Sequence, residues 1–226
     1  MTGGPSAIIF DLDDTLAATS PLWKRAETEL LASLGRNWEP KLARQYKGMN
    51  ALDVAATIHR ILEPEESKEE CQKRMREALF RSFEEGPLEP MPGAIGAVRM
   101  CSDVAPLALA SGSPLPLIRI VLERLEFPPV FQVLISSESV AKGKPFPDVF
   151  LSAANHLRVP PESCLVVEDS LIGARAAKAA RMKCFLVPSP ASQECAEAHT
   201  FPSLSDITRD DVRAAFAAGG PTTRTS

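Results

Sequence analysis

The clearest pattern in the chain is an uninterrupted apolar run at residues 7–10 that leads directly into carboxylates. A run without polar alternation is typical of a strand that is buried on both faces, as in a parallel sheet covered by helices. Asp11, Asp13 and Asp14 follow this run. Carboxylates this close repel one another and cannot all be buried unpaired, so we expect the strand to end in a solvated crevice. In open α/β sheets such a crevice lies beyond the carboxyl ends of the strands.

Residues 18–88 carry apolar positions at helical spacing and show no strand pattern. We predict three helices in this segment, because helix start and stop signals divide it. The signals are Ser20 as N-cap with Pro21 at the first helical position, Gly35 as a stop, Pro64 after the second helix, and Ser67 with Glu70 as a capping box. A helical segment of this length is too long for an ordinary connection and is a natural cap over the end of a sheet.

From Pro87 onward, short apolar runs alternate with helical patterns. The predicted strands are 105–110, 133–135, 164–167 and 184–187, and the predicted helices are 95–98, 118–125, 149–157, 173–180 and 206–217. Repeated β-α units predict a right-handed parallel sheet, here of five strands including 7–10. We therefore predict an α/β fold, a doubly wound parallel sheet, with an inserted α-helical cap. The core is expected to comprise residues 1–17 and 89–226, and the cap residues 18–88.

The composition of the 226 residues, 45% hydrophobic and 24% charged, is that of a globular protein with a sizeable core. The net charge of -4 gives no electrostatic reason to expect nucleic acid or an anionic membrane as a partner. No pair among the five cysteines has metal-ligand spacing, so we expect reduced thiols in a cytoplasmic protein. The sequence shows neither a signal peptide nor an apolar stretch of the ~18 residues that a membrane span needs. We expect a cytoplasmic monomer without membrane or nucleic-acid partners.

Polar side chains follow successive strands of the predicted sheet. Side chains alternate along a strand, so Asp11 and Asp13 should point the same way while Leu12 points into the core. One of these carboxylates can be a nucleophile and Mg²⁺ ligand, and the other a general acid and base. Glu168 and Asp169 end a later strand and offer further oxygen ligands for Mg²⁺.

A phosphoryl group needs a hydroxyl, a backbone N–H and an ammonium group around it. Ser111, Gly112 and Lys144 could supply these groups, with Lys142 as an alternative to Lys144. Each feature alone has a simpler explanation, since Ser111 could cap the next helix and Lys144 could be a surface lysine. Their joint occurrence at the ends of successive strands favours one binding site.

At these residues the chain resembles the haloacid dehalogenase superfamily, in its phosphatase and phosphomutase branch. Four motifs match in order, namely Asp11-Leu12-Asp13-Asp14-Thr15-Leu16, Ala110-Ser111-Gly112-Ser113, Lys144-Pro145-Phe146-Pro147-Asp148, and Val167-Glu168-Asp169-Ser170 with Gly173. The helical insert resembles the cap of the β-phosphoglucomutase-like group. At Asp14 this branch often has Gly, although many phosphatases of the superfamily also carry Asp there.

The resemblance implies a role for each matched residue. Asp11 would attack phosphorus and form an aspartyl-phosphate, and Asp13 would protonate the leaving oxygen and then deprotonate water. Mg²⁺ would be held by Asp11, the backbone carbonyl of Asp13, Asp169 and Glu168, the last directly or through water. Ser111, Gly112 and Lys144 would hold the phosphoryl oxygens. Dehalogenases of the superfamily lack the second carboxylate, so Asp13 argues against dehalogenation.

The leading interpretation is a Mg²⁺-dependent phosphatase that acts on a small phosphorylated metabolite, a sugar or nucleoside phosphate. A first alternative keeps the site and returns the phosphoryl group to a sugar hydroxyl, as a phosphosugar mutase does. A second alternative is a response-regulator receiver domain, which shares the sheet, the acidic Mg²⁺ pocket, the acceptor Asp, a hydroxyl residue and a Lys. Receivers are shorter, however, and lack both the helical insert and a second Asp on the same side. A purely structural protein would leave the acidic crevice unexplained.

Substrate choice is expected to lie in the cap. Residues 46–50 precede its second predicted helix and resemble the substrate-specificity loop of the group. Gly48 would permit a tight turn, while Lys47 and Asn50 would offer a charge and an amide to the substrate. An ordinary connection between helices remains open as an explanation. Residues 48–62 also resemble the same region of pseudouridine-5′-phosphatases, which does not name a substrate.

Two further positions weigh against the mutase alternative. β-Phosphoglucomutases commonly carry a His where this sequence has Trp23, and an Arg in the cap loop where Ala51 falls in an ungapped match. A Trp side chain has one donor and no acid–base capacity near neutral pH, and Ala has no polar group. We therefore expect hydrolysis rather than phosphosugar interconversion.

Overall fold

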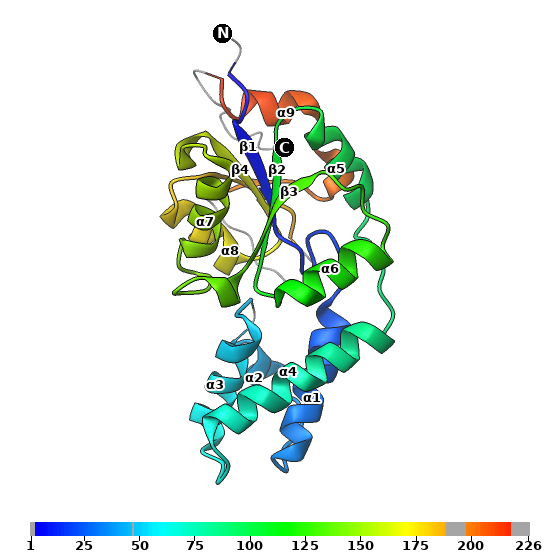
Figure 1. The fold of residues 1–226 in the computed structure, drawn as a ribbon, viewed down its shortest axis with the longest axis vertical. Helices are drawn as coiled ribbons and strands as arrows, with labels where there is room; N and C mark the ends of the chain where they lie inside the picture. The colour runs from blue at the N-terminus through cyan, green and yellow to red at the C-terminus, as the bar shows by residue number, and fades with distance from the viewer. Residues whose placement is uncertain (1–2, 47, 189–197, 218–226) are drawn as a thin grey trace.

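The computed structural model describes residues 3–46, 48–188 and 198–217. A parallel sheet with helices on both faces forms one half of the molecule, and a group of helices forms the other half (Figure 1). Among the described helices, none combines the length and apolarity that crossing a membrane requires.

The described residues form a six-stranded sheet in the order β3-β2-β1-β4-β5-β6, and every pair of neighbours is parallel. The strands are β1 (Ala7–Phe10), β2 (Leu107–Ser111), β3 (Phe131–Ser136), β4 (Cys164–Glu168), β5 (Lys183–Leu186) and β6 (His199–Thr200). The predicted α/β fold and the five predicted strands are confirmed, with β2 beginning two residues later than expected. The sixth strand was missed because two residues are too few to show a pattern.

Strand β1 lies at the centre of the sheet and is fully buried. Ile9 pairs with Ala108 of β2 on one side and with Val166 of β4 on the other. Ile8 and Phe10 contribute to one hydrophobic cluster, whereas Ala7 and Ile9 contribute to the second. Because alternate side chains face opposite sides of a sheet, the unbroken apolar run serves both clusters at once.

Helices cover the two faces of the sheet as those clusters require (Figure 1). One face carries α5 (Ala94–Ser102), α6 (Leu115–Arg124) and α9 (Arg209–Ala214), and the other carries α7 (Asp148–Leu157) and α8 (Leu171–Ala179). Short 3₁₀ turns lie at η1 (Ser137–Ser139), η2 (Pro161–Ser163) and η3 (Leu204–Asp206). The helix predicted at 206–217 is therefore shorter than expected, since Thr208 starts α9 with a capping box that includes Asp211.

The helical insert lies between β1 and β2, as predicted, and consists of α1 (Ser20–Ser33), α2 (Pro40–Ala43), α3 (Ala51–Leu62) and α4 (Lys68–Glu85). Helix α4 packs against both α1 and α3 through buried apolar residues that include Leu30, Ile58 and Leu79. Helix α2 was not predicted, because a single turn is too short to show helical periodicity.

The chain leaves and re-enters the core at adjacent points. The backbone N–H of Ala18 donates to the carbonyl of Glu89 at 2.9 Å, and Ala17 forms an isolated bridge with Pro90. These contacts support the predicted limits of the insert at 18 and 88, which remain a prediction. Since the strands run parallel, their carboxyl ends all face the insert (Figure 1).

The start of α1 differs from the expectation. Thr19, rather than Ser20, is the N-cap, and its side chain makes no capping bond. Asp14 takes this role instead, because its Oδ1 accepts from the backbone N–H groups of Thr19 (3.2 Å) and Ser20 (2.9 Å). Asp14 has a φ of 59°, a left-handed conformation that Asp tolerates better than most residues. At α4, Ser67 accepts from the backbone N–H of Glu70 at 3.2 Å, which is one half of the predicted capping box.

The turn before α5 generates a testable prediction about stability. Gly93 has a φ of 80°, and a Cβ there would lie 2.6 Å from the backbone nitrogen of Ser205. We expect Gly93→Ala to lower the free energy of unfolding by about 1–3 kcal/mol, through backbone strain and overpacking. Gly96→Ala is the control, because this exposed position in α5 has no atom within 4 Å of an added Cβ. It should raise the free energy of unfolding by about 0.5–1 kcal/mol. Urea unfolding measures both, and equal stability of the two variants would contradict the prediction.

Candidate active site

The end of β1 places two carboxylates at the edge of the sheet that faces the insert. The backbone N–H of Asp11 donates to the carbonyl of Val167 at 2.9 Å, which continues the pairing of β1 with β4 by one residue. Leu12 is fully buried between Asp11 and Asp13, and both carboxylates line the same cavity. The structure therefore agrees with the predicted alternation, in which Leu12 enters the core and the two Asp side chains face the cavity.

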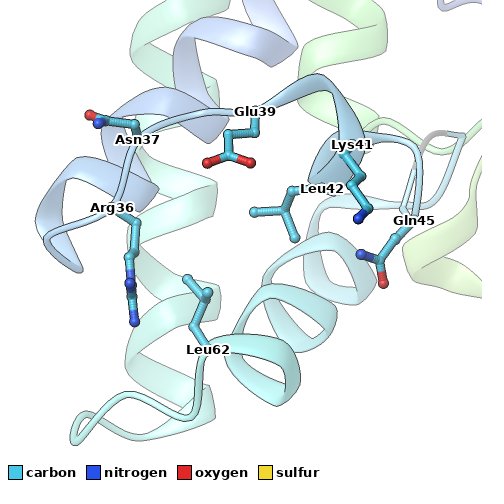
Figure 2. Close-up of a pocket in the computed structure, with 7 residues that line it drawn as sticks. All are labelled: Arg36, Asn37, Glu39, Lys41, Leu42, Gln45 and Leu62. Carbon is cyan, nitrogen blue, oxygen red and sulfur yellow. The ribbon is translucent and has the colours of Figure 1, made fainter.

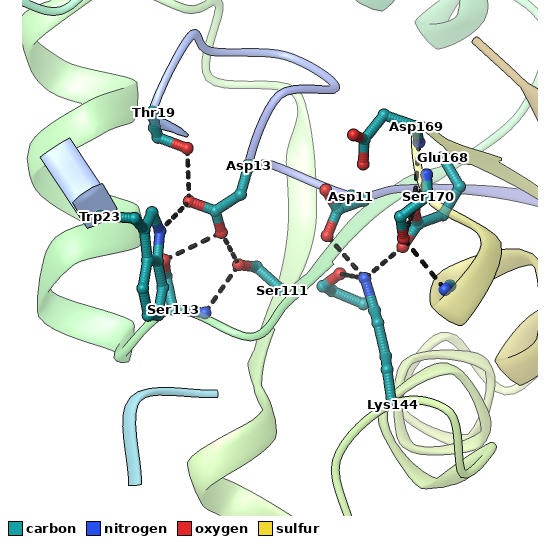
Figure 3. A network of polar contacts seen from close by, with 12 residues as sticks. Asp11, Asp13, Thr19, Trp23, Ser111, Ser113, Lys144, Glu168, Asp169 and Ser170 are labelled. Atoms are coloured by element: carbon teal, nitrogen blue, oxygen red, sulfur yellow. Dashed lines mark hydrogen bonds and ion pairs between the residues drawn. The ribbon is translucent and has the colours of Figure 1, made fainter. Parts of the chain in front are cut away.

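Lys144 lies at the centre of the acidic cluster (Figure 3). Its Nζ lies 2.6 Å from Oδ1 of Asp11, 2.5 Å from Oε1 of Glu168 and 3.3 Å from the carbonyl of Ala110. Burial alone would lower the pKa of Lys144, but the charges of Asp11 and Glu168 outweigh it and raise this pKa. Lys142 is exposed and lies over the ring of Phe146, so Lys144 is the lysine that reaches the carboxylates.

Glu168 is fixed by the turn that follows β4. Its Oε2 accepts from the backbone N–H groups of Asp169 and Ser170, both at 3.0 Å, and from the Ser170 hydroxyl at 2.9 Å. A Cβ at Gly173 would lie 1.8 Å from Oε1 of Glu168, so only glycine leaves room for this carboxylate. The motif residues Ser170 and Gly173 thus orient Glu168 toward Lys144 (Figure 3).

Asp11, Glu168 and Asp169 form a buried group whose ligand oxygens all lie within 4.8 Å of one another. Burial raises the pKa of Asp11 to about 8, against the lowering effect of Lys144 and with the help of Glu168 and Asp13. A bound cation would oppose this shift and favour the ionised carboxylate. Oxygen ligands at this spacing fit a hard divalent cation such as Mg²⁺, so three of the predicted metal ligands lie together.

Asp13 lies beside that group, and its carboxylate is held by four side-chain donors (Figure 3). Its Oδ1 accepts from the hydroxyl of Thr19 at 2.8 Å and from the indole N–H of Trp23 at 2.9 Å. Its Oδ2 accepts from the hydroxyls of Ser111 at 2.7 Å and Ser113 at 2.9 Å. Two of these donors, Thr19 and Trp23, belong to the start of the insert, and the two serines belong to the core. The hydrogen bonds of Asp13 therefore link the insert to the core.

The hydroxyl of Ser111 is occupied in this arrangement. It donates to Asp13 and accepts from the backbone N–H of Ser113 at 2.9 Å, so its contact with a phosphoryl oxygen stays a prediction. Sequence reasoning missed the roles of Ser113, Thr19 and Trp23 around Asp13. Ser113 could have been suspected from its spacing of two residues after Ser111. The other two contacts depend on how α1 folds back over the end of β1.

A cavity of about 420 Å³ lies between the core and the insert. It is lined by Asp11, Asp13, Asp14, Gly112, Lys144, Glu168, Asp169 and Ser170 from the core, and by Thr19, Ser20, Trp23, Lys24, Glu27, Trp38, Pro40, Ala43, Arg44, Tyr46, Gly48, Met49 and Val54 from the insert side. The predicted specificity loop therefore reaches the cavity through Tyr46, Gly48 and Met49.

The two loop residues predicted to contact a substrate are Asn50 and Lys47. Asn50 caps α3, because its Oδ1 accepts from the backbone N–H of Asp53 at 2.9 Å while its Nδ2 donates to Oδ2 of Asp53 at 2.7 Å. Its contact with a substrate stays a prediction. Lys47 lies outside the described residues.

Four insert side chains, Trp23, Glu27, Trp38 and Tyr46, form what we call the cap wall of the cavity. Oε2 of Glu27 accepts from the indole N–H of Trp38 at 2.7 Å and from the Tyr46 hydroxyl at 3.4 Å. Burial raises the pKa of Glu27, while these two hydrogen bonds and the charge of Lys24 oppose the shift. No motif marked this group in the sequence, because its members come together only through the packing of α1, α2 and their connection.

A smaller cavity of about 260 Å³ lies within the insert alone (Figure 2). Its lining residues are Arg36, Asn37, Glu39, Lys41, Leu42, Gln45 and Leu62. Because the carboxylates that end β1 and β4 are not among them, this second cavity is separate from the acidic cluster and from Lys144.

Comparison with known proteins identifies the family of this chain. A family model described as haloacid dehalogenase-like hydrolase matches residues 5–181. Hexitol phosphatase B of Escherichia coli (strain K12) is 36% identical over 196 residues, which are 83% of this chain and 85% of that protein. The phosphorylated carbohydrates phosphatase of Thermotoga maritima is 34% identical over 175 residues, which are 77% and 81% of the two chains. The crystal structure of CbbY from Rhodobacter sphaeroides in complex with phosphate has a TM-score of 0.78 and 28% identity, over 89% of this chain and 96% of that one.

The family match begins before β1 and ends just after α8, so it includes each of the four motifs and the whole insert. The resemblance expected from those motifs is confirmed by the match and by the identity to hexitol phosphatase B. The chain belongs to the haloacid dehalogenase-like hydrolases, in the phosphatase branch that carries a helical cap after its first strand.

Proposed function

We propose that this phosphatase hydrolyses small phosphorylated sugars or polyols in a Mg²⁺-dependent reaction with Asp11 as nucleophile. The observation that carries the proposal is one cavity in which Asp11, Asp13 and Lys144 face a wall of insert side chains. Two carboxylates with separate hydrogen-bond partners, next to a buried ammonium group, are what a two-step phosphoryl transfer requires.

Asp11 carries the first step. One of its carboxylate oxygens attacks phosphorus, the bond from phosphorus to the ester oxygen breaks, and Asp11 becomes an aspartyl-phosphate. Lys144, which lies 2.6 Å from Asp11, is suited to hold a phosphoryl oxygen during this transfer. The backbone N–H of Gly112 and the hydroxyl of Ser111 complete the proposed phosphoryl site.

Asp13 carries the proton in both steps. It gives a proton to the ester oxygen as the alcohol leaves, and then takes a proton from the water that attacks the aspartyl-phosphate. Inorganic phosphate is released and Asp11 is regenerated. The hydrogen bonds that Asp13 receives from Thr19, Trp23 and the two serines fix its orientation in the cavity, which supports this role.

Asp11, Glu168 and Asp169, with the backbone carbonyl of Asp13, are the groups proposed to hold Mg²⁺. When bound, the ion would offset negative charge on the transferring phosphoryl group. The support is the donor set itself, since three carboxylate oxygens within 4.8 Å of one another suit a divalent cation, and the single charge of Lys144 offsets only part of their negative charge.

The substrate class rests on the cavity and on the relatives. A volume of about 420 Å³ suits a small ligand, and aromatic side chains of the cap wall can pack against the carbon skeleton of a sugar. The names of the two similar enzymes, a hexitol phosphatase and a phosphorylated carbohydrates phosphatase, support a sugar or polyol phosphate over a nucleoside phosphate.

Two observations favour hydrolysis over the mutase alternative. Trp23 stands where β-phosphoglucomutases commonly carry His, and its indole can only donate to Asp13, without any acid–base capacity. Ala51 is fully buried as the first residue of α3 and offers no polar group to a second phosphate.

Asp11→Asn should lower the turnover of p-nitrophenyl phosphate by several orders of magnitude, because the amide keeps the size of the side chain but loses the nucleophile. EDTA should abolish the activity of the unaltered enzyme, and added Mg²⁺ should restore it. Asp210→Asn, at an exposed position of α9, is the matched control and should keep full activity. Full activity of Asp11→Asn, or indifference to EDTA, would refute the mechanism.

Asp13→Asn should slow hydrolysis of a sugar phosphate by about 10²–10⁴-fold, which is the usual contribution of a general acid and base. The Mg²⁺ concentration for half-maximal activity should change little, because the proposed ligand is the backbone carbonyl. The loss should be smaller for p-nitrophenyl phosphate, since p-nitrophenolate leaves without needing a proton. A variant whose main defect is weaker Mg²⁺ binding would show that the role of Asp13 is wrongly assigned.

Incubation with β-glucose 1-phosphate, Mg²⁺ and catalytic glucose 1,6-bisphosphate should not accumulate glucose 6-phosphate. Inorganic phosphate should instead appear from some member of a panel of sugar and polyol phosphates. The reason is that Trp23 and Ala51 lack the groups needed to reorient a bisphosphate intermediate and to shield it from water. Rapid formation of glucose 6-phosphate in a coupled dehydrogenase assay would establish the mutase alternative.

A further inference from the structure

Glu27 is an unusual residue in the cap wall. It lies in the middle of α1 with 8% of its surface exposed, on the side of the cavity formed by the insert. Charged side chains are rarely this buried unless they are paired or have a function. The mechanism proposed above does not use Glu27, so its position needs a separate explanation.

The partners of Glu27 account for only one of its two oxygens. The indole N–H of Trp38 and the hydroxyl of Tyr46 both donate to Oε2. Both groups act as donors here, because an indole has no acceptor and because burial and the nearby charge of Glu27 raise the pKa of Tyr46. Within the ranges that the structure describes, no hydrogen bond to Oε1 is found. A carboxylate that lines a cavity with one oxygen held and the other available is suited to accept hydrogen bonds from a ligand.

The neighbours of Glu27 favour a ligand with hydroxyl groups. Trp23, Trp38 and Tyr46 present aromatic surface in the same cavity, which can pack against the C–H groups of a carbohydrate. A carboxylate oxygen accepts well from adjacent hydroxyls. Lys24 lies with its Nζ 4.4 Å from the centre of the Trp38 ring, and its charge acts on Glu27. Lys24 is therefore already engaged in the cap wall.

We infer that Glu27 determines substrate specificity, by accepting hydrogen bonds from hydroxyl groups of the leaving sugar or polyol and by disfavouring a second phosphate at that end of the molecule. This inference rests on the proposed function. An uncompensated second phosphate beside a buried carboxylate would suffer like-charge repulsion in a poorly solvated place. The enzyme should therefore prefer monophosphates to the corresponding bisphosphates.

Glu27→Gln tests the inference sharply. The donors of Trp38 and Tyr46 will hold the amide oxygen, so the amide NH₂ group takes the place of Oε1. The substitution thus converts an acceptor into a donor and removes the negative charge, with almost no change in shape. Glu29→Gln is the matched control, because Glu29 is an exposed residue of the same helix that pairs with Arg81.

The measurement is kcat/KM for sorbitol 6-phosphate, fructose 1-phosphate, fructose 1,6-bisphosphate and p-nitrophenyl phosphate, with melting temperatures to check folding. For Glu27→Gln we expect the best monophosphate to lose about 10-fold or more, mainly through KM, since the site presents the wrong hydrogen-bonding group. The ratio of bisphosphate to monophosphate activity should rise by about 10-fold or more. Activity on p-nitrophenyl phosphate should stay within about 3-fold, because this ester carries no hydroxyl group for Glu27 to bind.

Several outcomes would overturn the inference. Equal losses on all four esters would make Glu27 a structural residue, and unchanged ratios would remove it from substrate recognition. If Glu27→Gln does not fold, Glu27→Asp is the second test. The shorter side chain keeps the negative charge but cannot reach the hydroxyl groups of the substrate. Activity on the monophosphate should therefore fall, while the bisphosphate should still be rejected. Unaltered monophosphate activity of Glu27→Asp, or a gain of bisphosphate activity, would refute the inference. A wild-type enzyme that is inactive on every sugar and polyol phosphate tested, yet active on p-nitrophenyl phosphate, would instead refute the proposed substrate class.

Discussion

The buried ammonium group of Lys144 is the contact on which the site depends. It lies within 2.6 Å of both Asp11 and Glu168, and only 6% of the residue is exposed. Without it, neighbouring carboxylates would face one another in a poorly solvated place, and loss of one partner from such a buried pair typically costs about 3–5 kcal/mol. The same ammonium group is the one proposed to hold a phosphoryl oxygen. Under that proposal, folding of the site and binding of its ligand rest on one side chain.

The sheet is what brings Lys144 and its partners together. Because β1 and β4 are parallel neighbours, Asp11 and Glu168 end adjacent strands at the same edge. The hydrogen bond from Asp11 to Val167 extends this pairing past the end of β1. The turn after β4 then fixes Glu168 through Ser170, in space that Gly173 leaves free. The geometry of the site is thus a consequence of strand order and register.

The sequence allowed the core of this arrangement to be predicted, because its signals are local. An unbroken apolar run marks β1, and polar residues directly after successive strands mark the acidic cluster and Lys144. Features that depend on tertiary packing were not predictable in this way. The cap on α1 comes from Asp14, five residues before the N-cap, and Glu27 meets Trp38 only after the insert has folded. Strand β6 was not predicted, because its two residues show no pattern of their own. The strand is defined only by its pairing with β5.

The paired exit and return of the chain at Ala18 and Glu89 has an evolutionary consequence. A segment whose two ends are adjacent can be lengthened, shortened or exchanged without altering the register of the strands that it interrupts. Cap wall residues such as Glu27 and Trp38 lie inside that segment, whereas Asp11, Lys144 and Glu168 lie outside it. Selection can therefore act on these two sets separately, as long as the insert keeps Thr19 and Trp23, which hold Asp13. Such a chain can acquire new substrates by drift in the insert while its phosphoryl chemistry stays constant.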